Sequence, residues 1–206
     1  RNMARRKFLL LIAVLSVALV ALVGSIWATL SGGRLTEVVD AVRIGGDFEL
    51  TDHTGRRVTA ADYKGRLQLV YFGYTFCPDV CITELTRVTE ALDALGPATG
   101  QQVGGLFVSV DPARDTVEVL RDYQSHFHPA ITMLTGSDAE IAQIAANYRV
   151  YYRRVSPDPD YLVDHSSFIF LLDRDGRYQT HFGPGDSVDK IVATVRTLLA
   201  LSLIHI

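Results

Sequence analysis

The chain has 206 residues, of which 48% are hydrophobic and 21% are charged, and its formal net charge is −3 at pH 7. This length and composition indicate a folded domain with a real core plus an additional segment, and they exclude a disordered or low-complexity chain. Charges of both signs are scattered along the sequence, which excludes the basic stripe of a nucleic-acid-binding protein.

Residues 8–30 differ from the rest of the chain because they contain no charged residue and consist mainly of Leu, Val, Ala and Ile. A helix over this run would be about 35 Å long, enough to cross a bilayer core of roughly 30 Å. By the positive-inside rule, the basic residues within 1–7 stay in the cytoplasm, which places everything after Leu30 on the other side. We therefore predict a cytoplasmic basic segment at 1–7 and a transmembrane anchor at 8–30. The alternative is a cleaved signal peptide, whose apolar region is normally about 7–15 residues long.

The rest of the chain divides into a predicted linker at 31–46, a domain at 47–200 and a tail of doubtful origin at 201–206, which carries no motif and is assigned no role. Within the domain, apolar periodicity and turn residues predict the elements. In chain order they are a hairpin of Phe48–Leu50 and Arg57–Thr59, a buried strand at Leu67–Phe72, a helix at Asp79–Leu95, a buried strand at Val103–Val110, helices at Thr116–His126 and Ser137–Asn147, a hairpin of Phe168–Leu172 and Tyr178–Phe182, and a helix at Ser187–Leu199.

The order of these elements predicts the fold class. A strand–helix–strand unit comes first, and after two helices a hairpin with a closing helix completes the domain. The simplest architecture that satisfies a βαβ unit followed by an antiparallel ββα unit is an α/β, thioredoxin-like fold, in which helices flank a central mixed sheet.

The two cysteines of the chain, Cys77 and Cys81, lie where the strand Leu67–Phe72 ends and the next helix begins. Open α/β sheets place ligand sites at this edge, and the spacing of four puts both sulfurs on one face of a first helical turn. A helix N-terminus also lowers the pKa of a thiol, which makes a thiolate accessible near neutral pH.

Three interpretations of this cysteine pair compete. A Cys77–Cys81 disulfide would close a very small loop and stabilise little. A redox dithiol is the second interpretation, although C-x-x-x-C is one residue longer than the C-x-x-C of thioredoxin-like oxidoreductases. The third is a soft-metal site, because two thiolates suit Cu(I), whereas zinc would usually need a fourth ligand or an open catalytic position. The spacing alone leaves the metal and redox interpretations open.

His165 differs from the other five histidines by its position just before the predicted strand Phe168–Leu172. That strand is expected to run antiparallel to Leu67–Phe72, so its beginning lies beside the end from which the cysteines emerge. His165 can therefore reach both sulfurs, and an imidazole is an acceptable copper ligand. The neighbouring Asp164 is a candidate for orienting the histidine, although a plain surface carboxylate is an equally good interpretation.

Three segments of the chain resemble the Sco/SenC copper chaperones. They are Tyr71–Cys81 (Y-F-G-Y-T-F-C-P-D-V-C), Val108–Asp115 (V-S-V-D-P-A-R-D) and Asp164–Leu171 (D-H-S-S-F-I-F-L). The resemblance extends from about Phe48 to Phe182, with two departures. Phe76 stands where the family often has His, and Ile82 follows the second cysteine where Pro is common.

The resemblance implies a thioredoxin-like domain that binds copper through Cys77, Cys81 and His165. It also implies that the domain faces the periplasm from a bacterial inner membrane, or the mitochondrial intermembrane space, and loads the dinuclear copper centre of cytochrome c oxidase. Asp111, which follows the strand Val103–Val110, is expected at the same edge of the sheet. There it would approach a bound Cu(II) or a docking partner, or simply start a turn before a helix capped by Asp115 or Thr116.

These features together predict a membrane-anchored copper chaperone and not an enzyme. Its expected partners are the copper-bearing subunit of cytochrome c oxidase and a thiol reductase, because an oxidised cysteine pair must be reduced before it can bind copper. The alternative is a thiol–disulfide oxidoreductase that reduces the copper-receiving cysteines of the same subunit. A third interpretation, a copper or redox sensor, also remains open.

Overall fold

The computed structural model describes residues 12, 15–27, 44–158 and 160–202. The chain divides into two compact units, Arg1–Arg43 and Ile44–Ile206. In the first unit, residues 15–27 are helical. Among the described residues, no helix is long and apolar enough to span a membrane. The basic segment 1–7, the ends of the predicted anchor, most of the predicted linker and residues 203–206 of the tail lie outside the described residues.

The second unit is built on a mixed sheet of seven strands in the order β2-β1-β5-β4-β3-β8-β9. Strands β3, β4 and β5 are parallel, while β8 runs antiparallel to β3 and β1 runs antiparallel to β5. The strands are β1 (Glu49–Asp52), β2 (Arg57–Thr59), β3 (Leu67–Gly73), β4 (Val103–Ser109), β5 (Ile131–Thr135), β8 (Ile169–Leu172) and β9 (Tyr178–Phe182). Every residue of β3 and β4 is buried, as expected of central strands covered on both faces.

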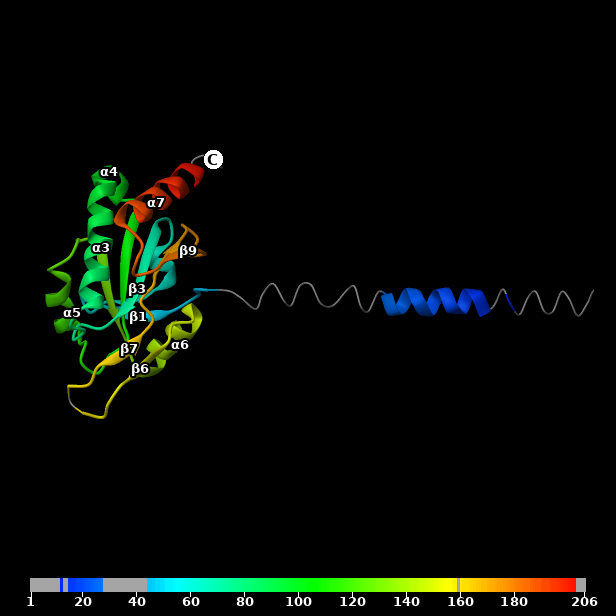
Figure 1. The fold of residues 1–206 in the computed structure, drawn as a ribbon, viewed down its shortest axis with the longest axis horizontal. Coiled ribbons are helices and arrows are strands. Elements are labelled where there is room, and N and C mark those ends of the chain that lie inside the picture. Colours follow the sequence, from blue (N-terminus) through cyan, green and yellow to red (C-terminus); the bar gives the residue numbers. More distant parts are fainter. Residues whose placement is uncertain (1–11, 13–14, 28–43, 159, 203–206) are drawn as a thin grey trace, which may run out of the picture. The chain divides into compact units, whose positions relative to one another are not determined.

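The helices of this unit are α3 (Val80–Leu95), the short α4 (Pro97–Gly100), α5 (Val117–Gln124), α6 (Asp138–Tyr148) and α7 (Val188–Ser202), with a 3₁₀ turn η2 at Ala60–Tyr63. Helices α3 and α7 pack side by side, and α6 lies on the other side of the sheet (Figure 1). A capping box between Ser137 and Glu140 starts α6, as the sequence predicted.

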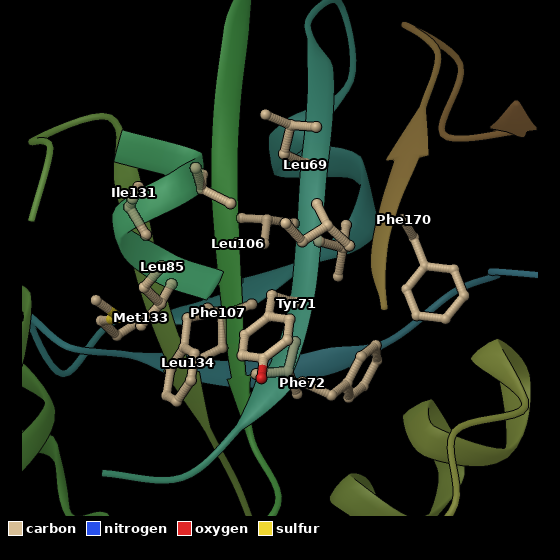
Figure 2. Packing of buried hydrophobic residues seen from close by; sticks show 14 of the residues in the cluster. Leu69, Tyr71, Phe72, Leu85, Leu106, Phe107, Ile131, Met133, Leu134 and Phe170 are labelled. Atoms are coloured by element: carbon tan, nitrogen blue, oxygen red, sulfur yellow. The ribbon is translucent and has the colours of Figure 1, made fainter. Parts of the chain in front are cut away.

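Alternation along β3 divides the core into two layers, because successive side chains point to opposite faces of a sheet. Tyr71 packs beside Phe107 (Figure 2), and these two side chains contact Cys81 of α3 and Tyr123 of α5, respectively. Phe72 points the other way, toward Phe170 (Figure 2). Its ring also packs against Tyr148 of α6, at 5.2 Å between centroids. The face with Tyr71 is the one that meets the cysteines.

The predicted βαβ and ββα units are confirmed as β3-α3-β4 and β8-β9-α7. The predicted succession of two helices was wrong, because β5 lies between α5 and α6. A two-stranded ribbon of β6 (Tyr152–Arg154) and β7 (Val163–His165) was also not predicted. His165 therefore lies on a strand of its own and not in a loop before β8.

Candidate metal site

Cys77 lies in the turn between β3 and α3, and Cys81 lies in the first turn of α3. The end of β3 leaves room for them because residue 73 is glycine. A Cβ atom at Gly73 would come within 2.8 Å of Cys81 Sγ and 2.9 Å of the Phe107 ring. The Cys77 N–H donates to the carbonyl oxygen of Tyr74 at 3.3 Å, which closes the turn that carries the first sulfur.

The two thiols are free and buried. The interaction with the Cys81 thiol is the main cause that lowers the pKa of Cys77, and the His165 side chain lowers it further against the opposing effect of burial. The same interaction, together with burial, raises the pKa of Cys81. The first proton therefore leaves Cys77, and the pair presents one thiolate beside one thiol. The thiolate is the form that binds metals and attacks disulfides.

His165 approaches this pair from β7. Its Nε2 lies 3.3 Å from Cys81 Sγ, and its Nδ1 lies 3.1 Å from the carbonyl oxygen of Ser166. When Nδ1 carries the proton and donates it to Ser166, the lone pair of Nε2 points at the sulfur. The rings of Tyr71 and Tyr74 pack edge-on against the imidazole, at 6.2 and 5.8 Å between centroids, and hold its orientation.

The ligand atoms of Cys77, Cys81 and His165 all lie within 4.8 Å of one another. Two sulfurs and one imidazole nitrogen form a donor set that suits Cu(I), which prefers soft ligands. A groove of about 300 Å³ opens beside the cluster. Its walls include Cys77 and Pro78 on one side and Leu162 and His165 on the other. Cys81 is fully buried, so an incoming molecule meets Cys77 and His165 first.

Asp111 and Asp164 do not belong to this cluster of three. The buried carboxylate of Asp111 accepts a hydrogen bond of 2.5 Å from the Tyr161 hydroxyl and another from Arg114 Nε. Asp164 is exposed, next to His165 on β7, and its carboxylate lies 3.8 Å from Arg153 Nη2. A role for either carboxylate toward copper or a partner stays a prediction.

Asp115 is a residue whose part in this region the sequence analysis missed. Thr116 caps α5 with its side chain, whereas the Asp115 carboxylate turns inward and binds Thr75 and Ser109. Tyr74 was also missed. Its hydroxyl accepts the N–H of Val163 at 3.2 Å and so joins the cysteine turn to β7. The signal for Asp115 in the sequence is its close spacing to Asp111, since both carboxylates follow the buried strand β4.

A protein-family model described as SCO1/SenC matches residues 37–200 of the chain. The SCO2-like protein of Rickettsia felis is 38% identical over 180 residues, which cover 82% of this chain and 87% of that protein. The mitochondrial SCO2 homolog of Homo sapiens is 41% identical over 171 residues, which cover 81% of this chain and 64% of that protein.

Solved structures give the same result. ScoI of Arabidopsis thaliana with copper bound is 38% identical, with a TM-score of 0.72 over 77% of this chain and 99% of that one. ScoI of Bradyrhizobium japonicum with copper bound is 42% identical, with a TM-score of 0.70, and the match covers 75% of this chain and 99% of that one. BsSco, described as a Sco-family cytochrome c oxidase assembly protein with a disulfide switch, is 22% identical with a TM-score of 0.62 over 76% and 94%, a likeness of fold.

Proposed function

The chain belongs to the SCO1/SenC family, and we propose that it is a copper chaperone that binds one copper ion through Cys77, Cys81 and His165. The observation that carries the proposal is the convergence of three ligand atoms within 4.8 Å at the edge of a groove. Relatives of the same fold, at 38% and 42% identity, have been solved with copper bound. The ion is cargo, delivered to the dinuclear copper centre of cytochrome c oxidase.

The three ligands have different parts in loading. The Cys77 thiolate faces the groove and takes up Cu(I) first. Cys81 then gives up its proton to solvent, so that two thiolates and one Cu(I) leave the centre with one negative charge. The Nε2 lone pair of His165 completes a three-coordinate site. Proton release on metal binding is the general behaviour of thiol ligands.

The burial of the ligands sets the order of release. A thiolate of the receiving protein can approach only from the groove, where Cys77 and His165 lie. Cys81 has no solvent exposure, so it is the last ligand to dissociate from the copper ion. Stepwise exchange of this kind keeps the copper coordinated throughout transfer.

We place the domain outside the cytoplasm, held by a membrane anchor at residues 8–30. The charge-free apolar run and the basic residues before it support this placement, and several relatives are named as mitochondrial proteins. The domain would then face the periplasm or the intermembrane space, where a thiol reductase must keep the cysteine pair reduced.

A second function is favoured by the cysteine chemistry. One thiolate beside one protonated thiol is also the arrangement of a dithiol reductant. In that reaction the Cys77 thiolate attacks a disulfide of the partner, Cys81 resolves the mixed disulfide, and the partner leaves with two thiols while Cys77 and Cys81 form a disulfide. This reaction uses the two cysteines and needs no histidine ligand.

Anaerobic titration of the reduced whole chain in detergent, with Cu(I) and a competing chelator, tests the proposal. We expect one copper per chain, and strongly weakened binding in His165→Ala with disulfide exchange mostly intact. Copper binding that is absent in the parent chain, together with rapid reduction of a partner disulfide, would overturn the chaperone in favour of the reductant.

A further inference from the structure

Asp115, between β4 and α5, is a buried carboxylate with no exposed surface. It accepts hydrogen bonds from the Thr75 N–H at 3.1 Å, the Thr75 hydroxyl at 2.6 Å and the Ser109 hydroxyl at 2.5 Å. All three donors are neutral groups. Burying a carboxylate is costly and is tolerated only where hydrogen bonds from the protein replace those from water. The three hydrogen bonds therefore hold the segments that carry Thr75 and Ser109 in place.

Two of the three donors, the Thr75 N–H and hydroxyl, belong to the turn that carries Cys77. Thr75 is two residues before Cys77, and Ser109 is the last residue of β4, in register with Gly73 at the end of β3. The Val110 N–H also donates to the Gly73 carbonyl at 2.8 Å. Asp115 therefore ties the exits of two adjacent parallel strands together at the point where the cysteine turn starts.

The other end of the turn lacks an anchor of this kind. Asp79 is the N-cap residue of α3, yet its side chain makes no capping hydrogen bond. The main-chain contact of Cys77 itself is the hydrogen bond from its N–H to the Tyr74 carbonyl at 3.3 Å, which lies on the Thr75 side of the turn. The position of Cys77 thus depends on how firmly the turn is held at Thr75.

We infer that Asp115 is a positioning residue that holds the cysteine turn in its ligand geometry before the metal arrives, through the Thr75 hydroxyl. The copper readout of this inference rests on the proposed function. The positioning itself is a property of the metal-free domain, because all its contacts lie within the protein. Holding ligands in place in advance raises affinity by removing the cost of ordering them on binding.

A second turn of the domain supplies a matched control. Asp52 is nearly as buried, and its carboxylate accepts the Thr54 N–H at 2.8 Å and the Thr54 hydroxyl at 2.6 Å. This pair lies in the hairpin turn between β1 and β2 and contacts no ligand of the site. Thr54→Val therefore removes the same hydroxyl–carboxylate bond as Thr75→Val at a place without cysteines.

The test compares Thr75→Val, its rescue variant Thr75→Ser, Asp115→Asn and Thr54→Val, each in the whole chain. Two quantities are measured: the Cu(I) affinity, and in the metal-free protein the rate at which a mixed disulfide with glutathione closes to the Cys77–Cys81 disulfide. The closing step releases one glutathione thiol and reports how well the two sulfurs are held together. Denaturant unfolding supplies the stability of every variant.

We expect Thr75→Val and Asp115→Asn to weaken Cu(I) binding about tenfold and to slow closure by a similar factor. Thr75→Ser should stay within about twofold of the parent, and Thr54→Val should lose stability but neither affinity nor closure rate. Equal closure rates in Thr75→Val and Thr54→Val would overturn the inference and leave Asp115 a plain stabiliser. If the parent chain binds no copper, the proposed function fails while the closure rates still decide the inference.

Discussion

The two halves of the site are built on different kinds of support. The cysteines come from the turn after β3, an interior strand of the seven-stranded sheet, and from the first turn of α3, and both are buried. The histidine comes from the two-stranded ribbon β6–β7, where Asp164 and much of β6 face solvent and His165 is half-buried. One ligand set can therefore combine a fixed pair with a third ligand on a more weakly supported element.

A few side-chain contacts hold the ribbon, and the loop that joins its strands, to the cysteine turn and to the segment after β4. The Val163 N–H donates to the Tyr74 hydroxyl, and the Tyr161 hydroxyl donates to buried Asp111. The guanidinium of Arg114 lies 3.7 Å from the centre of the Tyr161 ring. Elements with few buried contacts open locally at a smaller free-energy cost than core strands. We therefore expect the histidine half to open more readily than the cysteine half.

The largest effect should come from the cysteine half. Cys81→Ser removes a soft donor for which serine is a poor substitute, so Cu(I) affinity should fall by roughly a thousandfold, or about 4 kcal/mol. Anaerobic competition with a Cu(I) chelator measures it, and Cys77→Ser is the companion variant. Full affinity in either variant would show that copper binds elsewhere.

Removal of the ligand on the ribbon should have a smaller effect. His165→Ala should weaken Cu(I) binding by about 10–100-fold, because the two sulfurs remain and Cu(I) accepts low coordination numbers. Reduction of a model disulfide by the same variant should stay close to that of the parent chain. A loss as large as that of Cys81→Ser would show that the histidine half contributes as much to copper affinity as the cysteine half.

The hydrogen bond between the Val163 N–H and the Tyr74 hydroxyl, which joins the two halves, can be removed by deleting one oxygen atom. Tyr74→Phe removes the hydroxyl that accepts the Val163 N–H and keeps the ring that packs on His165. One lost hydrogen bond is worth about 1 kcal/mol, so the Val163 amide should exchange with solvent about fivefold faster and Cu(I) affinity should fall by less than in His165→Ala.

Tyr178→Phe is the control for that change, because its hydroxyl bonds His181 on the far hairpin. It should leave both quantities unchanged. Exchange at Val163 that is as slow in Tyr74→Phe as in the control would mean that the ribbon is held by other contacts.

The smallest effect should be on the unfolding free energy at acidic pH, through Glu140, which lies away from the metal site. The hydrogen bond from Arg57 is the main cause that lowers the pKa of Glu140 to about 2. A carboxyl with a lowered pKa stabilises the fold above its ordinary value of about 4.5 and loses that contribution as the pH falls toward 2. Glu140→Gln should therefore flatten the loss of unfolding free energy between about pH 5 and 3. An unchanged slope would show that this ion pair contributes nothing measurable.

The arrangement of the site followed from the sequence because it depends on strong local signals. The apolar run of β3, the cysteine spacing at a helix start and an antiparallel β8 together bring His165 to the cysteines. Strand β5 was missed because Ile131–Thr135 is short, and a short apolar run has no period that distinguishes it from a loop or a buried helix end. The ribbon was missed because β6 and β7 are three residues each and are joined across a long loop.

Asp115 illustrates a different reason for failure. A carboxylate before a helix is usually a cap, and local propensity assigns it that role. Here Thr116 takes the cap, and the carboxylate instead meets a hydroxyl forty positions earlier in the chain. A contact between residues forty positions apart arises from the packing of β3 beside β4. A local sequence pattern carries no information about that packing.

The burial of Cys81 also determines which of the two sulfurs an oxidant reaches first. Hydrogen peroxide reaches the groove and therefore the Cys77 sulfur, which we expect to form a sulfenic acid. The neighbouring Cys81 thiol condenses with that sulfenic acid, releases water and leaves a disulfide that a reductase can open. Sulfinic and sulfonic acids, which are largely irreversible, form only when a second oxidant arrives before this condensation. A sulfur with no exposed surface thus protects its partner from permanent damage.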